Sequence, residues 1–151
     1  MTALATRNPD FVATVRESFA RQQVMSTLGA SLTHIAPGEV DIQMPIRDDF
    51  TQQNGFLHAG ILATVADSAC GYAAYTLMPA GSDVLSVKFK LNLLAPAVGE
   101  SVIARARVLR AGRTITVCRA DVHARGKTGE KLIATMLGTM MNTEKQKSAT
   151  A

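Results

Sequence analysis

The first candidate for chemistry is Asp67, the only formally charged side chain between His58 and Met78. Drawn as a helix, this segment is apolar on nearly every side, so the carboxylate falls in surroundings that disfavour an unpartnered charge. A capping role does not fit, because Asp67 falls in the middle of the segment. A hydrogen-bonded structural aspartate is the alternative, but the isolation of Asp67, taken with its neighbours at the helix start, favours a functional role.

The second candidate is the start of the same segment. Gly55 permits a tight turn, His58 opens the helix, and Ala59 and Gly60 keep its first turn small. The first backbone N–H groups of a helix lack internal partners and carry the positive end of the helix dipole. They can hold a phosphate or a developing oxyanion. Many buried helices also begin with small residues, so this feature gains meaning only together with Asp67.

The spacing of the two candidates constrains how they can cooperate. Nine residues separate His58 from Asp67, which is about 13 Å along a helix axis and about half a turn around it. Within one helix they cannot meet at one reacting atom. If both act on one substrate, Asp67 must face the helix start of another subunit. Two such helices related by a two-fold axis would create two equivalent shared sites, so the dimer is the expected catalytic unit.

The elements that must position these residues follow from the apolar pattern. Phe11, Val15 and Phe19 predict a helix that Gly29 can close, and residues 58–78 predict a long buried helix. Alternating segments predict a hairpin and then four strands, at residues 31–35, 40–45, 84–94, 101–110, 114–124 and 132–141. The expected architecture is α+β, an antiparallel sheet curled around the long helix.

The sequence also predicts the two faces of the strand at residues 84–94 and the boundaries of the domain. Within residues 84–94 the pattern places Val87, Phe89, Leu91 and Leu93 on one face, opposite Ser86, Lys88, Lys90 and Asn92. We expect an N-terminal helical extension at residues 1–29, one domain at residues 30–143 and a disordered tail at residues 144–151.

Composition excludes several classes of protein. Cys70 and Cys118 lie in apolar stretches without a nearby partner, which predicts reduced core thiols in a cytoplasmic protein. No pair of His or Cys has ligand spacing, so no metal site is expected. The N-terminus lacks the apolar block of a signal peptide, and Asp67 interrupts the longest apolar region, which predicts no membrane span.

The net charge of +4 raises the question of an anionic partner. The chain has only 5% aromatic residues and no compact run of Lys and Arg, which argues against nucleic acid. A basic surface without a specific partner is one interpretation. A phosphate-rich small molecule is the specific alternative.

One set of spaced residues resembles the signature of the hotdog-fold acyl-CoA thioesterases, in their PaaI-like (phenylacetyl-CoA thioesterase-like) branch: Gln52, His58, Ala59, Gly60 and Asp67. The resemblance extends from about Ala30 to Met141 and includes the later segments SVKFKLNLLAPAVGE and GRT. It implies a hotdog fold, hydrolysis of an acyl- or aryl-CoA thioester, and no cofactor, since coenzyme A is part of the substrate. It also implies homodimers with interfacial sites, often paired into homotetramers.

The resemblance implies a role for each residue of the set. Asp67 would attack the thioester carbonyl or activate water, and the Ala59 N–H would polarise the carbonyl oxygen. Gln52 would position the thioester or the water, and His58, followed by Gly60, would orient the loop. Ser86 lies near the position of a water-orienting Ser or Thr, with an ordinary strand serine as the alternative. Many relatives have Gly where this chain has Ala59, and the added methyl group could narrow the pocket.

The resemblance also gives the basic residues a possible ligand. Candidates for the phosphates of coenzyme A are Lys88, Lys90, Arg110 and Arg113. Taken singly, each is better explained by a solvated strand face; as a group they favour a CoA ligand. For the acyl group, Phe56, Ile61, Leu62 and Tyr72 indicate an apolar or aryl chain of unspecified length.

Two other functions compete with thioester hydrolysis. A hydratase or dehydratase of the same fold needs a His–carboxylate pair at the Cα–Cβ bond, for which the chain offers no second match. A non-catalytic acyl-CoA-binding protein would have no need of Asp67.

Overall fold

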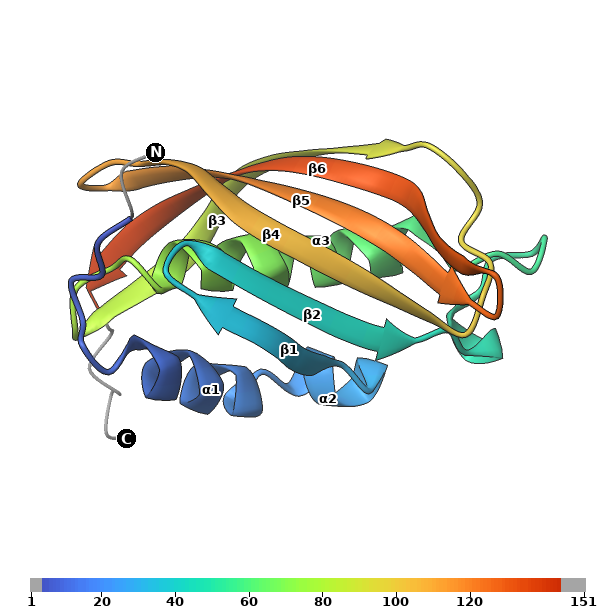
Figure 1. Ribbon diagram of the computed structural model, residues 1–151, viewed down its shortest axis with the longest axis horizontal. Coiled ribbons are helices and arrows are strands. Elements are labelled where there is room, and N and C mark those ends of the chain that lie inside the picture. Colours follow the sequence, from blue (N-terminus) through green and yellow to red (C-terminus); the bar gives the residue numbers. More distant parts are fainter. Residues whose placement is uncertain (1–3, 145–151) are drawn as a thin grey trace, which may run out of the picture.

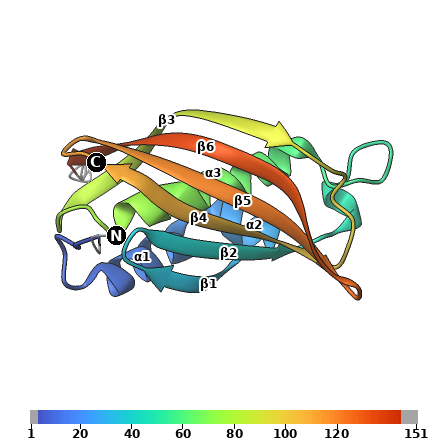
Figure 2. The ribbon, with the colours of Figure 1, turned by 45° about the horizontal axis from the view of Figure 1, so that its top comes forward.

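The computed structural model describes residues 4–144, and their alternating segments form one antiparallel sheet curled around a long helix (Figures 1 and 2). The sheet order is β1-β2-β4-β5-β6-β3, which places β1 and β3 at the two edges. The strands are β1 (Ser31–Ala36), β2 (Glu39–Pro45), β3 (Ser82–Leu93), β4 (Ser101–Ala111), β5 (Ile115–Gly126) and β6 (Gly129–Glu144). The predicted α+β architecture is confirmed.

The long helix α3 (Ala59–Tyr75) lies across the concave face of the sheet, and His58 is its N-cap. Its second half is buried without interruption from Ser68 to Tyr75. Its first half is less enclosed, since Ile61 and Ala63 are only partly buried. The expectation of a helix buried along its whole length is therefore wrong for the single chain. The sheet covers one side of α3, and in its first half Gly60 is exposed while Ile61, Ala63 and Thr64 are only partly covered by the rest of residues 4–144.

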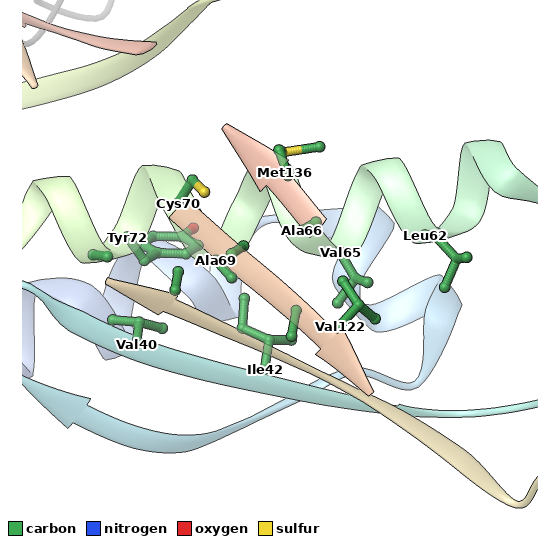
Figure 3. Close-up of a cluster of buried hydrophobic side chains, with 14 of the residues drawn as sticks. Val40, Ile42, Leu62, Val65, Ala66, Ala69, Cys70, Tyr72, Val122 and Met136 are labelled. Atoms are coloured by element: carbon green, nitrogen blue, oxygen red, sulfur yellow. The ribbon is translucent and has the colours of Figure 1, made fainter. Parts of the chain in front are cut away.

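The core lies between α3 and the sheet. Val65 from the helix points toward Val122 of β5 (Figure 3). Ile42 of β2 and Met136 of β6 belong to the same cluster, and all four are essentially inaccessible to solvent. On β4, alternation predicts that Val102, Ala104, Ala106 and Val108 point inward; the first three are buried and Val108 is partly buried. Cys70 and Cys118 are free thiols in this core, and burial raises the pKa of both.

Two helices precede the sheet, where the sequence predicts one. They are α1 (Phe11–Arg21) and α2 (Gln23–Leu28), and Gln22 between them has an extended conformation. Gly29 ends α2 in the left-handed region, as its position predicts. Buried side chains from both helices join the core of the sheet, namely Val15, Met25 and Leu28. The N-terminal segment is therefore packed as part of the same hydrophobic unit.

A β-bulge interrupts the regular alternation of β3. Ser86 pairs with Met140 and Lys88 pairs with Thr139, so Val87 is the extra residue on this strand. Met140 is fully buried, which places Ser86 on the inner face with Phe89, Leu91 and Leu93. The prediction that Ser86 shares a face with Lys88 and Lys90 is therefore wrong. Strict alternation fails here because one residue is inserted without a partner.

The C-terminal strand is longer than the sequence pattern predicts. Glu144, assigned above to a tail, is the last residue of β6, and residues 145–151 lie outside the described part of the chain. Within residues 4–144, no helix is long and apolar enough to cross a membrane.

Substitution at the centre of this core should be costly. We expect Ile42→Ala to lower the free energy of unfolding by about 2–5 kcal/mol, because it removes apolar contacts and leaves a cavity that rigid strands close only in part. Urea denaturation measures the change. Leu109→Ala, at a residue that is 58% exposed, is the matched control and should cost under about 1 kcal/mol. Equal losses for the two variants would contradict the assigned core.

Candidate active site

Asp67 lies on the side of α3 that faces the edge strand β3. The Ser86 hydroxyl donates a hydrogen bond to Asp67 Oδ1 at 2.7 Å, which the β3 bulge makes possible by turning Ser86 inward. Asp67 is only partly buried, because β3 is the last strand of the sheet and leaves this side open. The expected enclosed carboxylate is thus a half-open one with a single hydroxyl partner among the described residues. Its second oxygen, Oδ2, is left for a ligand or for water.

The start of α3 has the polarity expected of an anion-binding helix end. The Gly60 N–H donates to His58 Nδ1 at 2.9 Å, so His58 caps the helix through its ring. A ring nitrogen that accepts this bond carries no proton, which places the proton of the neutral ring on Nε2. The Ala59 N–H has no acceptor within residues 4–144 and is available to a ligand oxygen.

Gly60 is tied to this cap by space as well as by its N–H. A side chain at Gly60 would approach His58 Nδ1 to 3.1 Å, closer than most real contacts. The small residue that the sequence marks as a space for a ligand is therefore also required by the His58 ring.

The loop before α3 holds Gln52. It is closed by bonds from the Gln52 N–H to the Phe56 carbonyl and from the His58 N–H to the Phe50 carbonyl. Gly55 turns the loop at a positive φ of 80°. The Gln52 Oε1 atom accepts from the Asn54 N–H, and its amide nitrogen has no acceptor in the described part of the chain. Gln52 therefore keeps a free donor on the side of His58 and Ala59.

These residues line two different cavities. Gln52, His58 and Ala59 line one of about 560 Å³, together with apolar residues such as Leu62 and Leu93. Asp67 and Ser86 line another of about 290 Å³. The helical spacing predicts that Asp67 and the start of its own helix cannot act on one atom. This prediction is confirmed, because the two groups line different cavities of one protomer.

Several residues of the Asp67 cavity were missed by sequence reasoning. They come from α1 and the residue that follows it, from α3 and from the start of β3, and comprise Ser18, Arg21, Gln22, Ser68, Gly71, Asp83 and Val84. Gly71 could have been found, since it lies four residues after Asp67 and therefore on the same helix face. The residues before Gly29 carry no local signal, because their contact with α3 is made only in the folded chain.

Three of the four aromatic or aliphatic candidates for the acyl pocket line a cavity. Phe56 and Leu62 line the cavity of Gln52, and Tyr72 lines that of Asp67. Ile61 lines neither of the two. Burial raises the pKa of Tyr72, so its hydroxyl stays protonated and can donate at neutral pH.

The four basic candidates for coenzyme A are all exposed but do not form one cluster. Arg110 and Lys88 lie in one row across β4, β5, β6 and β3, on the face of the sheet away from α3. Three strand spacings separate them, about 14 Å. Lys90 lies in the next row on that face, and Arg113 lies in the turn between β4 and β5. Their assignment to phosphate binding stays a prediction.

A family model described as the thioesterase superfamily matches residues 54–130, which span the helix start, Asp67 and Ser86. The chain belongs to this superfamily. Acyl-coenzyme A thioesterase 13 from Homo sapiens is 31% identical over 105 residues, which cover 69% of this chain and 73% of that protein. The resemblance seen in the sequence is thereby confirmed at the level of the family.

Solved structures agree with this membership of the thioesterase superfamily. A thioesterase family protein from Silicibacter pomeroyi is 50% identical, with a TM-score of 0.88 over 89% of this chain and 99% of that one. The E. coli PaaI protein from the phenylacetic acid degradation operon superposes with a TM-score of 0.80 over 91% of this chain and 96% of that one. At 16% identity the second similarity supports the fold alone, and it confirms the predicted hotdog fold.

The cap on α3 gives a testable separation of structural and chemical roles for His58. We expect His58→Ala to lower the free energy of unfolding by about 1 kcal/mol, because the first turn loses its side-chain acceptor. His58→Asn should recover most of this loss, since Asn is a favoured N-cap residue. Denaturant unfolding of the three proteins measures both changes. Equal stabilities of the Ala and Asn variants would show that His58 does not act as a cap.

Proposed function

We propose that this thioesterase hydrolyses acyl-CoA thioesters at two equivalent sites, each shared between the subunits of a two-fold dimer. One observation carries the proposal: the carboxylate and the free amide end of α3 lie in separate cavities of one chain. Each cavity holds half of what thioester hydrolysis requires. The activity of acyl-coenzyme A thioesterase 13, a relative of this chain, supports acyl-CoA as the substrate class.

The exposed edge of the sheet supports the association of two copies. Strand β3 is 12 residues long, and Val87 and Phe89 on it are 56% and 45% exposed. A long apolar edge strand is a template for pairing with another chain. Two copies of β3 paired about a two-fold axis would continue the sheet and bring the half-open sides of both α3 helices together. Assembly of two such dimers into a tetramer is compatible with this pairing.

In the shared site, each group has a defined task. Ser86 holds Oδ1 of Asp67, so that Oδ2 can deprotonate a water molecule or itself attack the thioester carbonyl. The partner's Ala59 N–H would stabilise the negative charge that develops on the carbonyl oxygen. The partner's Gln52, with its free amide nitrogen, would orient the carbonyl or the water. On the general-base route, breakage of the C–S bond releases the acid and the CoA thiolate, which takes up the proton held by Asp67. On the nucleophilic route the thiolate leaves first and the acyl group stays on Asp67 as an anhydride; water then hydrolyses this anhydride, which releases the acid and supplies the proton to the thiolate.

Removal of the carboxylate charge should abolish most of the activity. We expect Asp67→Asn to reduce kcat for acyl-CoA by about 10²–10⁴-fold, because the amide can neither take a proton nor attack. Thiol release, followed with a thiol-reactive dye, measures the rate. Asp10→Asn, at an exposed position outside the cavity, is the matched control and should keep full activity. Wild-type turnover in a folded Asp67→Asn variant would remove Asp67 from the reaction.

A mixed dimer tests whether the site is shared. Asp67→Asn and Gln52→Ala subunits with different affinity tags are co-expressed, and the heterodimer is purified through both tags. We expect this heterodimer to recover about half of the wild-type activity, because one of its two sites receives an intact Asp67 and an intact Gln52. Each homodimeric variant serves as the inactive reference. If verified heterodimers stay as inactive as these references, the two residues act within one chain.

A further inference from the structure

The cavity beside Asp67 contains a glycine that packing within the chain does not require. Gly71 lies in the interior of α3, where glycine costs about 1 kcal/mol relative to alanine. A methyl group built at Gly71 would meet no atom within 4 Å. Gly71 follows Asp67 by four residues, so the missing side chain leaves open space on the same face of the helix as the carboxylate. The space extends from the candidate catalytic residue toward Tyr72.

The far end of the same cavity is polar, and the N-terminal helices make it so. The Gln22 amide nitrogen donates to Ser68 Oγ at 3.2 Å, and the Tyr72 hydroxyl donates to Gln22 Oε1 at 3.3 Å. Ser18 Oγ lies 3.3 Å from the same Tyr72 hydroxyl. The two bonds of the Tyr72 hydroxyl, at 3.3 Å, are long for bonds between oxygen atoms, and Gln22, Ser18 and Tyr72 all carry groups that can bind a ligand oxygen in place of one another.

The break between α1 and α2 is explained by this contact. Gln22 is the one extended residue between two helices, yet its neighbours Arg21 and Gln23 include no proline or glycine that would end a helix. Local sequence therefore does not require the break. The break lets the Gln22 side chain reach both Ser68 and Tyr72 on α3.

Size and charge narrow the ligand further. A volume of about 290 Å³ lies at the lower end of the range for small-molecule sites, which favours a compact group. The charged residues at the cavity are Asp67, Asp83 and Arg21, so carboxylates outnumber cations. An acyl group that ends in a carboxylate is therefore disfavoured. A neutral oxygen remains the group that the far end can bind. The helical rise from Asp67 to Tyr72 is about 7.5 Å, comparable to an extended six-carbon chain.

We infer that this cavity holds the acyl group of the substrate, and that it selects a compact acyl group with a hydroxyl or keto oxygen at its distal end. The inference rests on the proposed thioesterase activity at Asp67. Gly71 makes room for the acyl chain, and Gln22 and Tyr72 bind its terminal oxygen. The three are specificity-determining residues, and the expected apolar or aryl chain is extended by a polar group at its distal end.

Two CoA thioesters that differ by one hydroxyl test the polar end. Hexanoyl-CoA and 6-hydroxyhexanoyl-CoA are compared by thiol release. We expect the wild type to prefer the hydroxylated thioester by about tenfold in kcat/KM, because its terminal hydroxyl can hydrogen-bond to Gln22 and Tyr72, whereas the methyl end of hexanoyl-CoA must lie against these polar groups without a bond. In Tyr72→Phe and in Gln22→Leu this ratio should fall to about one. Gln23→Leu places the same substitution at the exposed neighbour and should keep the wild-type ratio.

The space at Gly71 is tested with a variant that should fold at least as well as the wild type. We expect Gly71→Ala to raise the unfolding temperature, through its better helix propensity, while lowering kcat/KM for both six-carbon thioesters about tenfold relative to acetyl-CoA. An unchanged ratio between six-carbon and two-carbon substrates would show that the acyl group does not lie beside Gly71.

The outcomes separate the inference from the function on which it rests. Hydrolysis without a preference for the hydroxylated thioester, or a preference that survives in Tyr72→Phe, would overturn the inference and leave the thioesterase intact. Failure to hydrolyse any of the three thioesters would overturn both.

Discussion

The rigidity of α3 is the constraint on which the candidate site depends. A helix keeps Asp67 about 13 Å from its own free amide end and half a turn away, and no rotation of a side chain closes that distance. A second copy can supply the missing half without deforming either chain. The open side of α3, the apolar edge of β3 and the two separate cavities are all consistent with that requirement. In the proposed dimer, the same rigidity holds Asp67 of one subunit close to the amide end of α3 of the other.

The features that follow from local pattern could be predicted from the sequence. The run of apolar residues around Asp67 gave a helix, and the alternation in β4 gave the inward set Val102, Ala104 and Ala106. The helix cap at His58 and the left-handed Gly29 also have local causes. The rise per residue of an α-helix is enough to predict that the Asp67 carboxylate and the amide end of the same helix lie far apart. These elements depend on neighbours within a few positions along the chain.

The features that could not be predicted from the sequence depend on contacts between segments that are far apart along the chain. The extended Gln22 has its partners on α3, 46 and 50 residues away, and nothing beside it in the sequence marks the break. The partial exposure of Asp67 depends on which strand ends the sheet, and β3 occupies that edge although it falls in the middle of the strand sequence. Ser18 reaches the Tyr72 hydroxyl for the same reason. Strand order and inter-helix contacts are set by the whole fold, so a one-dimensional pattern does not contain them.

The single extra residue in β3 has a consequence for how this strand can vary. On a regular strand, the residue that contacts Asp67 and the apolar residues on the same face of the sheet would be separated by an even number of positions. Val87 separates them, so that the segment before it faces α3 in one phase and the segment from Lys88 to Leu93 follows another. The extra residue thus shifts the inner face from even-numbered positions up to Ser86 to odd-numbered positions from Phe89 onward. Deleting Val87 would make Ser86 and Lys88 neighbours in a regular ladder with Ser86 and Phe89 still on the inner face, so the hydroxyl would stay opposite Asp67 while the local bend of the edge would be lost.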